Sequence, residues 1–281
     1  MQPQDNYLKK EINIPINISE KARVFLMIEL CEKGVSLVWH SLHPKEIAGA
    51  EVYNFEEKDN IEEVLSGIFT NILNSKYHPE QIRISYNYKQ SLLVPEKYYQ
   101  SSTNADMLNL LYLESHSDIV KSDHIPELEM YHIYRVPKKI NDLVLSMLPN
   151  GINFHSTSKQ ILMNKEDEGS HLLCIVFYHR IKVILFKEGI LQIVQQFEYN
   201  TPEDVAYYLL NVCEQYHVNS TEVKLRLQGL IVKDSKLYEY LYNYFLQIDL
   251  ALASSKVSLT PHFVHQTKYF LSHLIDLATC E

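Results

Sequence analysis

Two pairs of histidines have a spacing that could bind a metal. His40 and His43 are three residues apart, and so are His262 and His265. Two histidines at that spacing could share one face of a helix and hold an ion such as zinc. His43, however, directly precedes Pro44 at the end of an expected strand, and neither pair has a third ligand close in sequence. We therefore interpret both pairs as surface or capping histidines and expect no metal site.

Acidic side chains and one lysine form the second candidate group. Glu29 lies at the end of an apolar run, and Glu62 and Glu63 begin a helical pattern. A metal-dependent nuclease needs carboxylates from several elements, but residues 81–88, which include the next expected strand, contain no acid. The sequence therefore disfavours a nuclease. The pair Lys33-Gly34 could hold an anion, but it is also typical of an ordinary hairpin turn.

Charge and cysteine usage limit the class of protein. The chain has 26 Lys and Arg against 35 Asp and Glu, a net charge of −9, which disfavours a nucleic-acid-binding protein. Its four cysteines are far apart and are typical of reduced residues in a reducing compartment. No run of about 18 apolar residues predicts a transmembrane span, and the polar start lacks the apolar core of a signal peptide. We expect a cytoplasmic protein that binds no nucleic acid.

The elements that would position these residues occur in the same order twice. Each half begins with three runs typical of strands, at 24–28, 35–39 and 47–55 and again at 172–177, 181–186 and 190–199. A helix follows in each half, capped by Asp59 in the first and by Thr201 in the second. Alternating segments at 81–86 and 223–227 then predict a fourth strand in each half.

The second half closes with a helix, a strand and a helix, at 235–245, near 246–253 and after Pro261. The first half should close in the same way, with a helix near 105–113, a strand near 129–136 and a helix at 137–148. We therefore predict two β-β-β-α-β-α-β-α units, at 20–165 and 169–281. The stretch 91–128 is interpreted as a modified or inserted region of the first unit. Strands of this kind form a mixed sheet with helices on both faces.

This order resembles the duplicated ribonuclease-H-like unit of the actin-like ATPases. It is most similar to the cytoplasmic actin-like proteins of bacterial pilus assembly and type II secretion, in which a strand and helix such as 130–140 lead to a linking segment like 152–162. The chain also resembles an uncharacterised bacterial family, a domain of unknown function with this fold. The resemblance covers nearly the whole chain as a pattern of elements. It implies an α/β, actin-like ATPase fold with two units that face a cleft.

The resemblance also implies where a nucleotide would bind. In actin-like ATPases each leading hairpin carries Asp-x-Gly, in which the glycine lets backbone N–H groups approach the phosphates and the acid acts through magnesium and water. The first hairpin here has Glu29 near the acid position but Cys31 in place of the glycine. The second hairpin has neither acid nor glycine, and the double glycine that packs against adenosine is reduced to one. The degenerate nucleotide-site positions are Glu29, Lys33, Gly34, Tyr178, His179, Arg180 and Gly229.

These observations lead to one main hypothesis and two alternatives. We predict a non-catalytic protein-binding or scaffold protein that uses no cofactor, on a degenerate actin-like ATPase fold. The first alternative is a divergent ATP-binding actin-like protein, with Lys33, His179 and Arg180 as a cationic phosphate clamp. The second is a small-molecule enzyme that works in the cleft. The tyrosine-rich stretches Tyr98-Tyr99 and 238–244 are expected to contribute to a protein interface, and dimerisation is left open.

Overall fold

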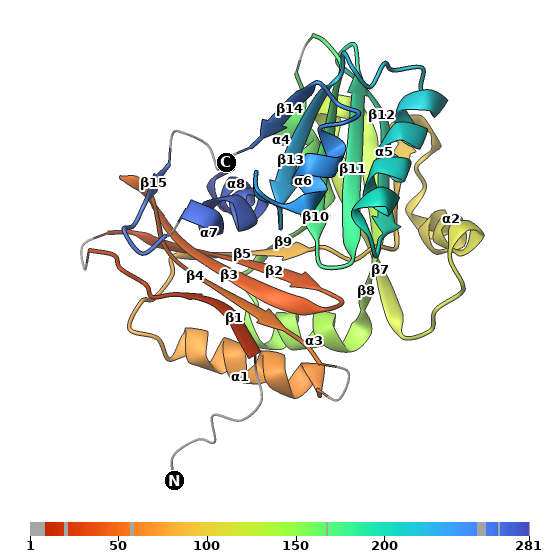
Figure 1. Ribbon diagram of the computed structural model, residues 1–281. Coiled ribbons are helices and arrows are strands. Elements are labelled where there is room, and N and C mark those ends of the chain that lie inside the picture. The colour runs from red at the N-terminus through yellow and green to blue at the C-terminus, as the bar shows by residue number, and fades with distance from the viewer. Residues whose placement is uncertain are drawn as a thin grey trace. The chain divides into compact units, whose positions relative to one another are not determined.

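The chain is built from two units, each with its own mixed β-sheet (Figure 1). The computed structural model describes residues 9–19, 22–56, 59–166, 168–251, 257–263 and 265–280. Unit 1 comprises Met1–Gln160 and Ser258–Thr260, and unit 2 comprises Ile161–Val257 and Pro261–Glu281.

The main sheet of unit 1 has the order β1-β4-β3-β2-β5-β9, and β15 also pairs with β4. Its strands are β1 (Lys9–Ile14), β2 (Val24–Cys31), β3 (Gly34–Leu42), β4 (Lys45–Asn54), β5 (Gln81–Tyr86), β9 (Ile152–His155) and β15 (Ser258–Leu259). β2, β3 and β4 are joined by antiparallel pairing, whereas β5 is parallel to both β2 and β9. Seven of the eight residues of β2 are buried, as expected of a central strand that is covered on both faces.

Two helices pack on the same face of this sheet, as Figure 1 shows. They are α1 (Ile61–Leu73) and α3 (Lys138–Met147). Their apolar sides, which include Leu65, Phe69 and Val144, join one core cluster with Leu26 and Ile28 of β2. The expected N-cap of α1 is wrong by one residue, because Asn60 holds that position and makes no side-chain capping bond. Asp59 instead accepts a 2.7 Å hydrogen bond from the backbone N–H of Glu56.

A separate three-stranded sheet in unit 1, of order β6-β8-β7, corrects one expectation. Its elements are β6 (Ser91–Pro95), the 3-10 turns η1 (Glu96–Tyr98) and η2 (Ser101–Thr103), α2 (Asn104–Leu111), β7 (Asp118–Ile125), η3 (Pro126–Leu128) and β8 (Met130–Pro137). The strand expected near 129–136 exists as β8, but it pairs with β6 and β7 rather than with the main sheet. The parallel position beside β5 is filled by β9, so the additional region extends as far as β8.

A buried hydrogen-bond network joins the small sheet to the start of α4 (Ser156–Asn164). The carboxylate of Asp123 on β7 accepts from the Tyr134 hydroxyl at 3.0 Å, from the His155 backbone N–H at 2.7 Å and from the Ser158 hydroxyl at 2.6 Å. The ring of His132 on β8 contacts the same serine oxygen, with 3.0 Å between Nδ1 and Oγ. Asp123 thus satisfies donors at the N-terminus of α4, where a negative charge is favoured.

Unit 2 repeats the strand order of unit 1 without the additional sheet. Its order is β12-β11-β10-β13-β14, which matches β4-β3-β2-β5-β9 strand for strand. The strands are β10 (His171–Phe177), β11 (Arg180–Lys187), β12 (Ile190–Glu198), β13 (Lys224–Gly229) and β14 (Gln247–Leu250). As in unit 1, the first strand pairs antiparallel with the second and parallel with the fourth.

The helices of unit 2 begin at the predicted signals. They are α5 (Pro202–Gln215), α6 (Lys236–Leu241), α7 (His265–Phe270) and α8 (Ser272–Thr279). Thr201 caps α5 in a reciprocal capping box with Asp204, and the Ser235 side chain caps α6 by accepting from the Tyr238 N–H. The expected last helix is divided into α7 and α8 at Leu271.

Candidate functional site

The first leading hairpin, β2–β3, shows what occupies the expected phosphate loop in unit 1. Glu29 is buried within β2, and the Lys33 carbonyl accepts a 2.8 Å hydrogen bond from Phe55 N–H. A Cβ added to Gly34 would lie 2.3 Å from the Tyr53 carbonyl oxygen. The glycine is therefore explained by its close approach to β4, and Lys33-Gly34 has the geometry of an ordinary hairpin turn.

The second leading hairpin, β10–β11, places three large side chains at its turn. Tyr178 is 71% exposed, and its ring packs edge-on against the ring of His179 with the centroids 4.3 Å apart. His179 has a φ of +64°, the left-handed conformation that a glycine would adopt at less cost. Arg180 begins β11, with its guanidinium 4.9 Å from the centroid of the Phe177 ring.

Gly229, at the end of β13, is used for packing between strands. Its φ is +85°, and an added Cβ would lie 2.2 Å from the carbonyl oxygen of Val176 on β10. Its own N–H donates to the Ser272 hydroxyl at 3.4 Å, and the next N–H, of Leu230, donates to Val176 at 2.8 Å. The backbone donors around this glycine thus have partners inside unit 2.

The histidine at the end of the second strand is a core residue. His40 is 2% exposed and stacks on Phe25, with the ring centroids 5.5 Å apart. Burial, followed by the nearby charges of Arg83 and Lys45, lowers the pKa of His40 to about 4. In the part of the chain that the structure describes, no group of three or more His, Cys, Asp or Glu side chains could hold a metal ion.

The tyrosine-rich stretches are partly exposed. Tyr242 and Tyr244 at the end of α6 are 58% and 36% exposed, and Tyr98 is 62% exposed. Tyr99 instead stacks on Tyr131 of β8, with the ring centroids 3.6 Å apart. Tyr238 and Tyr242 line a hollow of about 290 Å³ together with Lys233 and Glu239. These rings remain an expected interaction surface.

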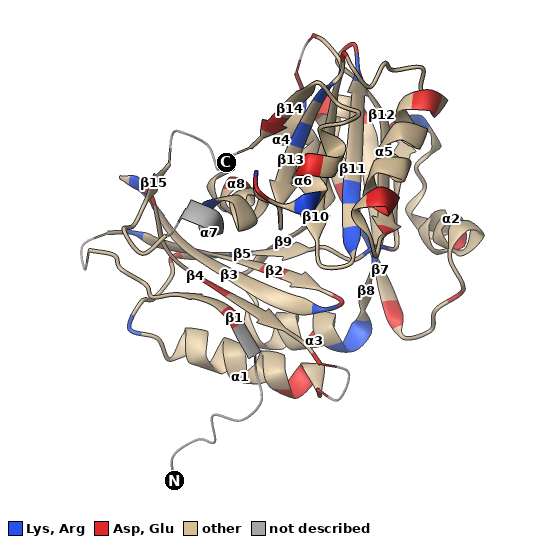
Figure 2. Ribbon diagram, in the orientation of Figure 1, with Lys and Arg blue, Asp and Glu red and all other residues tan. Residues whose placement is uncertain are grey.

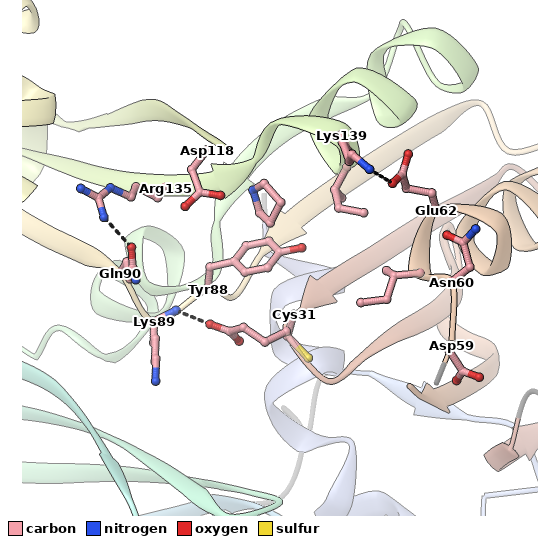
Figure 3. Close-up of a pocket in the computed structure, with 14 residues that line it drawn as sticks. Cys31, Asp59, Asn60, Glu62, Tyr88, Lys89, Gln90, Asp118, Arg135 and Lys139 are labelled. Atoms are coloured by element: carbon pink, nitrogen blue, oxygen red, sulfur yellow. Dashed lines mark hydrogen bonds and ion pairs between the residues drawn. The ribbon is translucent and has the colours of Figure 1, made fainter. Parts of the chain in front are cut away.

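A pocket of about 500 Å³ lies in unit 1. Ligand pockets typically have volumes of roughly 300–1,000 Å³. The pocket lies where the β2–β3 hairpin, the start of α1, the segment after β5, β7, the end of β8 and the start of α3 meet (Figure 3). Cys31, Ile61, Tyr88, Pro137 and Ile140 supply its apolar lining. Every one of these residues belongs to unit 1.

Most of the charged groups of the pocket already have partners. Lys139, at the start of α3, forms a 2.9 Å ion pair with Glu62 at the start of α1, and Figure 2 shows these two helix ends as basic and acidic. Glu32 accepts a 2.7 Å hydrogen bond from the Lys89 backbone N–H. Arg135, a third cation of the pocket beside Lys89 and Lys139, is instead hydrogen-bonded to neutral oxygens.

Arg135 is 4% exposed, although it lines the pocket. Its guanidinium donates to Gln90 Oε1 at 2.8 Å, to the Leu113 carbonyl at 2.7 Å and to Asn109 Oδ1. These bonds hold the segment after β5 and the segment after α2 against β8. We interpret Arg135 as the residue that fixes the wall of the pocket.

Three polar side chains of the pocket have no hydrogen-bond partner among the described residues. Asn60 is exposed, whereas Asp118 is half-buried and Tyr88 is only 8% exposed as a residue. Figure 3 shows the Tyr88 ring across the middle of the pocket with its hydroxyl pointing inward. Burial is the main reason that the pKa of Tyr88 is raised well above its ordinary value, and nearby acids including Glu32 and Asp118 add to the shift. Tyr88 is thus a neutral phenol that can donate or accept a hydrogen bond.

None of the degenerate nucleotide-site positions predicted from the sequence lines this pocket. Tyr88 follows β5 directly, and ligands of open α/β sheets bind beyond the carboxyl ends of the strands, so its position carried a usable signal. Asp118 and Arg135 carried none, because they reach the pocket only through the small sheet, whose pairing the sequence did not predict.

Two sheets with one strand order, joined by helices in corresponding places, define the actin-like ATPase fold, and the chain has that fold. The chain belongs to a family of proteins of unknown function, DUF3822, whose model matches residues 13–248. No curated protein sequence is significantly similar to the chain.

Solved structures with this fold cover most of the chain. A Bacteroides thetaiotaomicron protein with actin-like ATPase fold and unknown function is 17% identical, covering 95% of this chain and 100% of its own, with a TM-score of 0.74. A PilM–PilN type IV pilus biogenesis complex provides a chain that is 10% identical over 90% of this chain and 95% of its own, with a TM-score of 0.63. The ethanolamine utilization protein EutJ from Carboxydothermus hydrogenoformans is 7% identical over 95% and 92%, with a TM-score of 0.52. None of the described helices is long and apolar enough to span a membrane.

Proposed function

We propose that the chain is a non-catalytic protein-binding module that receives a segment of a partner protein in the pocket of unit 1. The observation that carries the proposal is the pair of unpartnered polar groups, Tyr88 and Asp118, within an apolar pocket. A ligand that covered these groups without giving them a hydrogen bond would lose about 1–3 kcal/mol for each of them. The two groups therefore favour a ligand that supplies a hydrogen-bond donor inside the pocket.

The geometry of the two leading hairpins supports a non-catalytic role. Phosphate binding in this fold relies on backbone N–H groups that glycine brings close to the ligand. The glycine of the first hairpin, Gly34, faces β4, and Gly229 faces β10. The turn of the second hairpin presents the side chains of Tyr178 and His179. Neither hairpin therefore offers an open cradle of amides within its own unit.

The comparison with the PilM–PilN complex supports a protein partner. That structure is a complex of two proteins, and one of its chains shares this fold over most of its length. A pocket walled by six different segments also suits a partner chain, because side chains and backbone on several sides can each find a contact.

Chemical blocking of Cys31 tests the proposal. This thiol lines the pocket and is half-buried, whereas Cys174 and Cys213 are buried in unit 2. A Cys280→Ser background therefore leaves Cys31 as the accessible thiol. We expect short random peptides displayed on phage to yield binders of the unmodified protein that are lost after N-ethylmaleimide treatment. The same binders should persist on treated Cys31→Ser, Cys280→Ser protein.

Two results would overturn the proposal. The first is a selection in which no binder depends on an unblocked Cys31. The second is a rise in melting temperature with millimolar Mg-ATP that is lost on Arg180→Ala or Lys33→Ala, because it would establish the nucleotide-binding alternative.

A further inference from the structure

We infer that the partner segment is basic, and that it places a lysine or arginine side chain against Asp118 while an apolar residue covers the ring of Tyr88. This inference rests on the proposed function, since it specifies the chemistry of the ligand at the same pocket. It follows from comparing the charged groups of the pocket that have partners with those that do not.

The cations of the pocket leave little attraction for an acidic ligand. Lys139 is paired with Glu62 at 2.9 Å. Arg135 is buried and donates to three oxygens of its own unit. Lys89 points away from Tyr88 and Asp118 in Figure 3. An acidic segment would have to break one of these arrangements before it gained a partner.

The acids of the pocket are not compensated to the same extent. Glu62 is neutralised by Lys139, and its place in the first turn of α1 offsets the positive end of that helix. The Asp118 carboxylate makes no hydrogen bond and no ion pair with any described residue. It begins β7 opposite Pro137, which has no N–H to offer. A half-buried carboxylate in such a place attracts a cation more strongly than a fully exposed one does.

Tyr88 connects the charged and apolar parts of the pocket. Its ring belongs to the same hydrophobic cluster as Ile61 and Ile140, and Figure 3 shows its hydroxyl pointing into the pocket. Tyr88 is only 8% exposed as a residue, and its hydroxyl has no hydrogen-bond partner among the described residues. A guanidinium or ammonium beside Asp118 can donate to this oxygen, and the face of the ring can pack against an aliphatic residue or the stem of the basic side chain.

Charge reversal at Asp118 tests the inference with the pocket-dependent peptides of the phage selection. These peptides should be enriched in Lys and Arg and depleted of Asp and Glu. Asp118→Asn should weaken the binding of a selected synthetic peptide about tenfold. Asp118→Lys should abolish it, and should restore binding to the same peptide in which the critical basic residue is replaced by Glu. Asp106→Lys, an exposed charge reversal on α2 outside the pocket, should leave binding unchanged.

The outcomes separate this inference from the proposed function. Pocket-dependent peptides that are neutral or acidic, or that bind Asp118→Lys as well as the unaltered protein, would refute the basic partner and leave the proposed function standing. A selection without any pocket-dependent peptide would refute both. An equal loss of affinity in Asp106→Lys would also refute the inference, since it would reveal general attraction of cations to an acidic protein rather than recognition by Asp118.

Discussion

Replacement of Asp123 is expected to loosen the small sheet of unit 1 from the rest of that unit. Three donors, from Tyr134, His155 and Ser158, lose their acceptor in Asp123→Ala. Each buried group left unsatisfied costs about 1–3 kcal/mol. The loss is partly offset because the buried charge also disappears and because Ser158 keeps its contact with His132. We therefore expect a net loss of about 3–5 kcal/mol in the free energy of unfolding.

Asp123→Asn should cost no more than about 1 kcal/mol at neutral pH, because the amide oxygen can accept from two donors while the Tyr134 hydroxyl rotates to accept from the amide NH2. Burial is the main reason that the pKa of Asp123 is raised, so the folded chain binds this proton more tightly than the unfolded chain does, and protonation of Asp123 stabilises the fold. That contribution is fully present below the unfolded pKa of about 3.9 and is lost as the pH rises through the higher folded pKa. The stability of the wild type relative to the Asn variant should accordingly increase as the pH falls.

Urea unfolding measures both variants. It can be followed by the fluorescence of Trp39, the single tryptophan of the sequence, which is 3% exposed in β3 of unit 1. An Ala variant as stable as the Asn variant would refute the reasoning, since the unsatisfied donors are the only difference that it invokes. So would an Asn variant whose difference from the wild type does not change with pH.

Three further predictions concern the rest of the chain. Gly229→Ala should lower the melting temperature and cost about 2 kcal/mol or more, because of its positive φ and the contact with Val176; an unchanged melting curve would contradict this. His40→Leu should raise the free energy of unfolding at neutral pH by about 1 kcal/mol, because neither ring nitrogen has a hydrogen-bond partner among the described residues. The wild type should lose stability as the pH falls from the unfolded histidine pKa of about 6.5 towards the folded pKa of about 4. His40→Leu should not show this loss, and unfolding at a series of pH values would detect the difference. Millimolar Mg-ATP should leave the melting temperature unchanged, whereas a concentration 100 times a true Kd would add about 2.7 kcal/mol.

The repeated strand order could be read from the sequence because local signals marked it. Continuous apolar runs identified β2 and β10. A turn follows each of these strands, and each pairs with the strand that comes next along the chain. Thr201, with a proline and two acids behind it, identified the start of α5. These features act over a few residues, so they do not depend on the rest of the fold.

The partner of β5 could not be predicted in the same way. β9 has only four residues, two of them buried, and four residues carry no clear period. Its place in the sheet depends on the free edge of β5, which is distant in sequence. β8 is longer and more buried, and so it was the stronger local candidate for that place. The pocket was missed for the same reason, because the small sheet that carries Asp118 and Arg135 is defined by long-range pairing.

The additional sheet of unit 1 also has a consequence for the order of folding. Only 17 residues separate β13 from β14 in unit 2, whereas 65 residues separate β5 from β9 in unit 1. Closing the longer loop costs about 1 kcal/mol more in chain entropy if the segment is still unstructured. A segment that has already formed its hairpins behaves as a much shorter connection, so β9 should join its sheet after β6, β8 and β7 have paired. Mutations in the small sheet are then expected to slow the refolding of unit 1, even where they lie far from β9.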